Sequence, residues 1–158
     1  MTYVAGLTHV RKRRFEVYIR TATTITWATN ANHATLIGLM ENIGKCEGNA
    51  VMVNTVGEGL TLMNDGSQKP TNFKGTLEIK HLNTSVANAA ALEAFENKYV
   101  DIMLDDQTDG HEFQILVKNV LLWIDEEGGD GTVLSYTLKA DKEVNQKSDF
   151  RAYGEFEA

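Results

Sequence analysis

The sequence predicts a mainly β protein with one flanking α-helix. Apolar and polar residues alternate over residues 73–82, which is typical of a strand with one buried face. Residues 85–99 carry apolar side chains at three- and four-residue steps, the period of a helix. Residues 113–140 form two apolar runs around a glycine-rich turn, as in a β-hairpin. We therefore expect an antiparallel sheet with the helix packed against it.

The chain begins with two segments of different character. Residues 1–14 are weakly patterned, end in a basic run at 11–14, and predict an N-terminal arm. Residues 15–27 alternate strictly and predict one strand, which at about 3.3 Å per residue would span roughly 43 Å. Because a typical strand has about five or six residues, we expect this one to bend across two sheets or to reach a neighbouring subunit.

A short helix and a long loop are predicted next. The helix is expected to begin at Asn30 or Asn32 and to include Ile43, with Gly44 as its C-terminal cap. The loop, residues 46–72, is the least regular part of the chain and is interpreted as a long excursion or a loose hairpin. Loops of this length inside a compact domain are usually functional or disordered.

The helix at residues 85–99 has local signals of its own. Thr84 or Ser85 is placed to cap its first turn, and three consecutive alanines favour helical backbone. The side expected to face the sheet consists of Val86, Ala89, Leu92, Phe95 and Tyr99. A strand at residues 100–105 and a polar turn at 107–110 are expected to follow.

The C-terminal third is predicted to hold a hairpin and a terminal arm. The outward strand, residues 113–124, is apolar on both faces near its end, so we expect burial on both sides, in a sandwich or a subunit contact. The acidic segment 125–131 is expected to turn and residues 133–140 to return. Residues 143–158 are interpreted as a C-terminal arm whose spaced aromatic residues form an edge strand or dock on a neighbour.

Length and composition are those of one domain, expected at residues 15–142. The chain has 158 residues, 42% hydrophobic content, and no apolar run approaching the roughly 18 residues of a membrane span. We expect a protein kept in solution inside a cell, and the lone Cys46 agrees with a reducing compartment. The net charge of −7 includes the basic run at 11–14, so the remaining body is still more acidic and disfavours a DNA-reading domain.

Residue types that carry chemistry are scattered along the chain. The four histidines are not spaced as paired metal ligands. The sequence places no residues beside Cys46 that would complete a zinc site or a catalytic site. Residues 105–110 open like a calcium-binding loop, but the twelfth position is Leu116 instead of glutamate. Gly57 and Gly59 lack the third glycine of a phosphate-binding loop. We therefore expect no enzyme, and no catalytic, metal or cofactor site.

The order of strand 73–82, helix 85–99, strand 100–105 and hairpin 113–140, without catalytic motifs, resembles a bacteriophage tail tube protein. That family is similar in fold to the inner tubes of contractile tails and type VI secretion systems. The resemblance, which covers residues 15–140, implies a β-sandwich or half-barrel. Six copies would close into a ring by pairing sheet edges, and the rings would stack into a tube.

The resemblance also implies a location and partners. The protein would be a structural component of the virion tail, assembled in the bacterial host cytoplasm, through which DNA passes without specific binding. Besides itself, it would meet tape-measure and tail-terminator proteins, and no membrane. An acidic lumen would repel DNA, because like charges repel.

The residues predicted to serve these roles fall into three sets. The lumen is expected to be lined by Glu16, Glu78, Asp125 and Glu126. Contacts of the long loop with an adjacent ring are expected at Gly57, Glu58, Gly59, Asp65, Gly66 and Lys69. Contacts between subunits are expected at Arg11, Arg13, Arg14, Trp123, Phe150 and Tyr153.

Two other readings of the sequence stay open. One is a virion or secretion-tube component of similar fold, such as a tail terminator or connector, which would stop at a single ring. The other is a small β-rich enzyme or ligand-binding protein with a pocket between helix and sheet, which would be a stable monomer or dimer. The long loop favours the tube.

Overall fold

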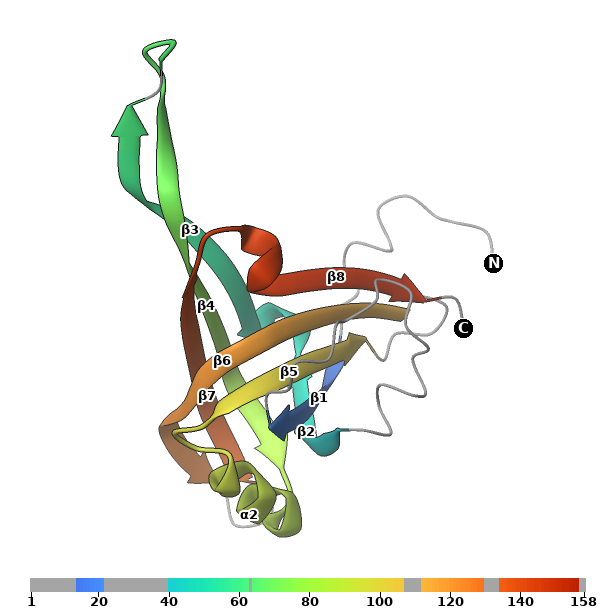
Figure 1. Cartoon of the computed structure of the whole chain (residues 1–158). Coiled ribbons are helices and arrows are strands. Elements are labelled where there is room, and N and C mark those ends of the chain that lie inside the picture. Colours follow the sequence, from blue (N-terminus) through green and yellow to red (C-terminus); the bar gives the residue numbers. More distant parts are fainter. Residues whose placement is uncertain (1–13, 22–39, 63, 107–111, 130–133, 157–158) are drawn as a thin grey trace, which may run out of the picture.

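The protein is mainly β with one α-helix in the part that the computed structural model describes, residues 14–21, 40–62, 64–106, 112–129 and 134–156 (Figure 1). The strands are β1 (Arg14–Thr21), β2 (Glu41–Glu47), β3 (Val51–Leu62), β4 (Gln68–Thr84), β5 (Tyr99–Asp106), β6 (Glu112–Gly129), β7 (Leu134–Val144) and β8 (Arg151–Phe156). The helix is α2 (Val86–Ala94), and two single-turn 3₁₀ helices cover Gly48–Ala50 and Lys147–Asp149. The predicted fold class is confirmed at this level.

The strands form one antiparallel sheet in the order β2-β1-β5-β6-β7-β4-β3, with β8 paired to the start of β6. One further register pair, Lys45 opposite Asn83, connects β2 to β4. This contact brings two distant strands of the path together, but it is too limited to make the sheet a clear barrel. Every pairing between these strands is antiparallel.

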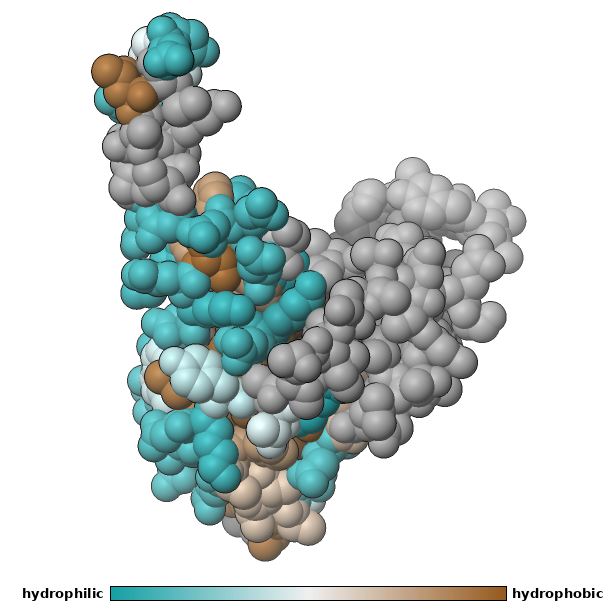
Figure 2. Space-filling view, viewed as in Figure 1, coloured by the Kyte–Doolittle hydropathy of each residue, from teal (hydrophilic) through white to brown (hydrophobic). Residues whose placement is uncertain are grey.

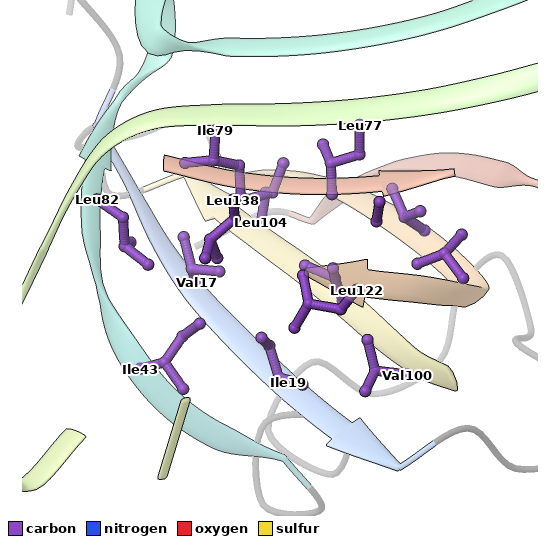
Figure 3. Close-up of a cluster of buried hydrophobic side chains, with 14 of the residues drawn as sticks. Val17, Ile19, Ile43, Leu77, Ile79, Leu82, Val100, Leu104, Leu122 and Leu138 are labelled. Carbon is purple, nitrogen blue, oxygen red and sulfur yellow. The ribbon is translucent and has the colours of Figure 1, made fainter. Parts of the chain in front are cut away.

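An apolar core lies on the concave side of this sheet (Figure 3). Val17 and Ile19 of β1 meet Leu122 of β6 and Leu138 of β7 there, and all four side chains are almost fully buried. Complete burial of a side chain of this size contributes about 1.5–3 kcal/mol. The core therefore joins strands from both ends of the chain into one unit.

A β-bulge at Asn119 changes which side chains of β6 face the core. Val120 lies opposite Val100 and Val117 opposite Ile102, so residues 118 and 119 together oppose the single residue 101, and β6 has one extra residue. Asn119 has a φ of 47°, a left-handed conformation that asparagine tolerates. Odd-numbered Val117 and even-numbered Val120 consequently share one core. The assignment of Val117 and Val120 to opposite faces is therefore wrong, because it assumed uninterrupted alternation, whereas the burial of both Leu116 and Val117 agrees with the predicted burial on both sides.

Helix α2 begins as predicted and ends earlier. The Ser85 hydroxyl accepts a hydrogen bond from the backbone N–H of Asn88 at 3.2 Å, which identifies Ser85 as the N-cap. Ala89 and Leu92 are buried against the sheet, whereas Val86 is 78% exposed. The helix stops at Ala94, so Tyr99 belongs to β5. Of the side predicted to face the sheet, only the middle part therefore packs against it.

Residues 41–47 form β2 and not the end of a helix. Gly44 lies opposite Val17 in the β1–β2 ladder, and Ile43 is fully buried in the core. The φ of Gly44 is 149°, and a side chain there would overlap the backbone of Asn83. The predicted helix cap is therefore wrong: this glycine permits the close approach of β2 to β4. The expected start of that helix lies outside the described residues.

Several predicted segments have different bounds in the structure. The start of the predicted strand at residues 15–27 lies in β1, and its residues beyond 21 are outside the described part, as are 1–13 and the turn at 107–110. Residues 125–129, predicted as a turn, continue β6 and pair with β7. A bulge at Asp125 shifts the register of the β6–β7 ladder by one residue, and the pairing continues beyond it with Glu126 opposite Thr137.

The C-terminal segment, predicted as an arm, joins the sheet through β8. Of the two alternatives for its aromatic residues, the edge strand is confirmed. Phe150 precedes β8 and is fully buried, and its backbone oxygen accepts a hydrogen bond from Lys118 N–H at 2.9 Å. The prediction that Phe150 contacts another subunit is therefore wrong, because its ring packs over Gly75 inside its own domain.

Candidate assembly interface

A two-stranded arm projects from the body of the protein (Figure 1). The β3–β4 ladder continues to the pair Leu62–Gln68, whereas β7 stops accompanying β4 at the pair Phe73–Val144. Residues 57–72, here called the arm, therefore extend beyond the rest of the sheet by roughly 16 Å at about 3.3 Å per residue. Of the two interpretations of residues 46–72, the hairpin is confirmed, and it is regular because each strand supplies the other's backbone partners.

The tip of the arm is closed by a compact turn. The Asp65 carboxylate accepts a hydrogen bond from the Ser67 N–H at 2.9 Å and another from its hydroxyl. Gly66 between them has a φ of 84°, which glycine adopts without strain. These hydrogen bonds lower the pKa of Asp65, because they stabilise its charged form. The arm thus carries a negative charge at its exposed tip.

Apolar side chains on the arm and its base are exposed to solvent. Leu62 near the tip is 71% exposed and Val56 at the base is 53% exposed. Figure 2 shows hydrophobic surface near the end of the arm and again over α2 at the opposite end of the molecule. Isolated two-stranded hairpins are marginally stable in water. A projecting hairpin with an exposed apolar side chain near its tip is typical of a segment that another surface covers.

All six predicted loop contacts lie on or at the tip of this arm: Gly57, Glu58, Gly59, Asp65, Gly66 and Lys69. The structure therefore brings together residues that the sequence analysis placed in one irregular segment.

Two strands, β3 and β8, each have one edge that is suited to pairing with a further strand. In the described part of the chain, β3 pairs only with β4, and β8 pairs only with β6. Strand edges without a partner strand are templates for pairing with another chain. Both strands belong to the same eight-stranded sheet, but they are not neighbours in its pairing order. Such an arrangement suits pairing between unlike edges of successive subunits.

Two of the four predicted lumen acids converge on one lysine. Lys139 Nζ lies 3.8 Å from Glu78 and 3.3 Å from Asp125, on the sheet face opposite the core. Glu78 also pairs with Lys80 at 3.4 Å. These contacts balance the acids with lysines, and exposed pairs of this kind contribute at most about 1 kcal/mol each.

The other two acids lie elsewhere. Glu16 accepts a hydrogen bond from the Tyr18 hydroxyl at 2.8 Å and lies 3.7 Å from Lys45. Burial, and then the nearby Glu16, raise the pKa of Tyr18. Glu126 is exposed in the β6–β7 ladder. The structure thus distributes the predicted lumen set over several sheet positions.

The predicted subunit contacts are also distributed. Arg14 is exposed at the start of β1, and Trp123 is half-buried opposite Lys139. Tyr153 lies in β8 opposite Ile115, and Phe150 is buried as described above. Arg11 and Arg13 lie outside the described residues.

A buried ion pair was not predicted. Arg20 Nε lies 3.1 Å from Asp101 Oδ2, and the other Asp101 oxygen accepts a hydrogen bond from Asn119 N–H at 2.8 Å. Both side chains are almost fully buried. Asp101 therefore links β1 to the bulge of β6. The signal in the sequence was an aspartate inside an apolar strand.

Two cavities open on the described surface. One of about 600 Å³ is lined by residues of β4, β6 and β7 and the segment after β7. The other, of about 520 Å³, lies where β2, the end of β4 and the start of α2 meet, and includes Arg14, Lys45 and Asn88. Ligand pockets of this size are usually lined mainly by apolar side chains. Here most of the lining residues of both cavities are polar.

Cys46 borders the second cavity, and burial raises its pKa to about 12, which keeps the thiol protonated at neutral pH. Within the described residues, no group of three or more histidine, cysteine or acidic side chains is arranged to hold a metal ion. No helix in that same part of the chain has the length and hydropathy needed to cross a membrane.

Comparisons with known protein families, curated proteins and solved structures find no match to this chain.

Proposed function

We propose that this protein is a structural component of a bacteriophage virion that polymerises into stacked hexameric rings, forming the tail tube through which DNA passes. The observation that carries the proposal is the arm at residues 57–72, a regular hairpin that projects beyond its own domain with Leu62 exposed near its tip. Such a segment supports self-assembly, because it can cover surface on a neighbouring copy.

Two further features support assembly. Among the described strands, β3 pairs only with β4 and β8 only with β6, and their other sides are suited to edge-to-edge pairing, which in the proposal closes the ring and completes a half-barrel in each subunit. The net charge of −7 per chain disfavours adhesion to a DNA backbone that slides past. In the virion, the tube would meet tape-measure and tail-terminator proteins at its centre and end.

Electron microscopy of the purified protein tests this function. We expect hollow tubes or stacked rings at high protein concentration in negative stain, and light scattering that falls to small species on dilution. Single rings that never stack would favour a tail terminator or connector. A monomer at all concentrations, even with preformed tube ends added as seeds, would overturn the proposal and favour a ligand-binding protein.

A further inference from the structure

We propose that the tip of the arm of one copy docks into the 520 Å³ cavity at the far end of a second copy, with Asp65 between Arg14 and Lys45. This inference rests on the proposed stacking and names the surface that receives the arm. The tip of the arm and the cavity, which this inference brings together, lie at opposite ends of β4.

Most of the residues that line the receiving cavity are polar, and two of them are cations. The lining includes Arg14, Lys45 and Glu47, together with the amide side chains of Asn42, Asn83 and Asn88, and Lys45 also lies 3.7 Å from Glu16. The first turn of α2, capped by Ser85, also opens on it. Backbone N–H groups at a helix N-terminus favour negative charge, so the cavity suits a carboxylate surrounded by hydrogen-bonding groups.

The tip of the arm is complementary to the two cations of this cavity in charge. Its outermost residues are small and polar, and the Asp65 carboxylate is held at the turn by Ser67. Cation and amide donors on one side therefore meet a carboxylate on the other. Charge complementarity of this kind selects partner and register.

The arm cannot occupy the cavity of its own chain. β4 begins at the tip of the arm and ends at Thr84, which lines the cavity. Its 17 residues span roughly 50 Å at about 3.3 Å per residue. Figure 1 shows the tip of the arm and the end of β4 at opposite ends of this paired strand. Because Thr84 at that end lines the cavity, the occupant must come from another copy. Two unlike surfaces at opposite ends generate an open, head-to-tail stack.

Apolar surface beside the tip of the arm and beside the cavity makes the two regions complementary in a second way. Leu62 lies just before the tip, and Val86 lies in the first turn of α2 beside the cavity. Ala90 and Ala94 continue an exposed, smooth face along the helix. A helix that is apolar on its outer as well as its inner side is usually covered. The docked arm would bury Leu62 against this face.

Charge substitutions at the tip and in the cavity test the docking. Asp65→Asn removes the charge, and asparagine retains the ability to form the turn. We expect Asp65→Asn, Asp65→Lys and Lys45→Glu each to raise the protein concentration needed for stacking by about tenfold or more. Asp65→Lys combined with Lys45→Glu should restore stacking toward the wild-type level. Glu143→Lys changes the same charge on an exposed residue of β7 and should leave stacking unchanged.

The outcomes separate this inference from the proposed function. Wild-type stacks that persist in Asp65→Asn and Asp65→Lys, with circular dichroism confirming folded protein, would overturn the docking and leave the tube intact. Stacking lost in the single variants without recovery in the double variant would also contradict the Asp65–Lys45 pairing. Failure of the wild-type protein to form rings or stacks would instead refute the function itself.

Discussion

Gly75 shows how one missing side chain positions the end of the chain. A Cβ atom at this position of β4 would overlap the ring of Phe150. Phe150 in turn is fully buried and immediately precedes β8. The absence of a side chain at Gly75 therefore makes room for the aromatic anchor that holds the last strand on the sheet.

Replacing Gly75 with alanine should consequently destabilise the protein. We expect the free energy of unfolding to fall by about 1–3 kcal/mol, because overpacking displaces the Phe150 ring. Urea unfolding followed by circular dichroism measures this change. Gly128→Ala is the matched control, since no atom lies within 4 Å of a Cβ there. Equal stabilities of the two variants would contradict this role of Gly75.

Cys46 reports on the integrity of the core. Burial raises its pKa from 9.0 to about 12, so the folded state retains the thiol proton at pH values where the unfolded chain loses it. The stability due to this difference is complete below pH 9.0 and is lost as the pH rises toward about 12.

We therefore expect Cys46 to resist thiol reagents in the folded protein and to react completely in denaturant. Absorbance during incubation with a chromogenic disulfide at pH 8 measures the rate. A Cys46→Ala variant provides the reagent blank. Rapid labelling of the native protein would show that the thiol is accessible.

At the scale of elements, the arm is separable from the sheet. Its strands pair with each other from Glu58–Asn72 outward, whereas the pair Val56–Lys74 lies beside β7. Removing the residue pairs of the arm therefore breaks no strand pairing in the rest of the sheet. The core residues of β4, such as Leu77 and Ile79, lie farther along the strand.

A register-matched deletion uses this separation. Replacing residues 58–72 with Asn-Gly leaves Gly57 opposite Phe73 and closes the hairpin with a two-residue turn. We expect a folded protein with a nearly unchanged melting temperature that no longer stacks, as judged by circular dichroism and negative-stain microscopy. Tubes of normal length from this variant would refute the role of the arm.

At the scale of the whole molecule, charge sets the behaviour toward nucleic acid. The chain carries a net charge of −7, and its described lysines are partly engaged with acids, as Lys139 is with Glu78 and Asp125. Proteins that grip DNA instead present a continuous basic surface.

We expect no shift of double-stranded DNA in an electrophoretic mobility assay at about 0.15 M salt, the physiological ionic strength, for subunits and for assemblies alike. A basic DNA-binding protein run in parallel confirms that the assay detects binding. Retention of DNA by micromolar protein would contradict transport without adhesion.

The local patterns of the sequence determined what depends on neighbours along the chain. Alternation predicted the strand at residues 73–82, and Ser85 and the alanines after it predicted the start of α2. Composition likewise determined the acidic net charge. These features follow from backbone preference and side-chain period, which act within a few residues.

Only the tertiary structure decided what depends on distant partners. The bulges at His81 and Asn119 place Leu82 and Val120 in the core although simple alternation points them outward. Gly44 lies in a strand because β4 passes close to it. The arm is regular because β3 and β4 pair, and Phe150 is buried because Gly75 makes room. Cross-strand register and close packing involve residues far apart in sequence, so no local pattern specifies them.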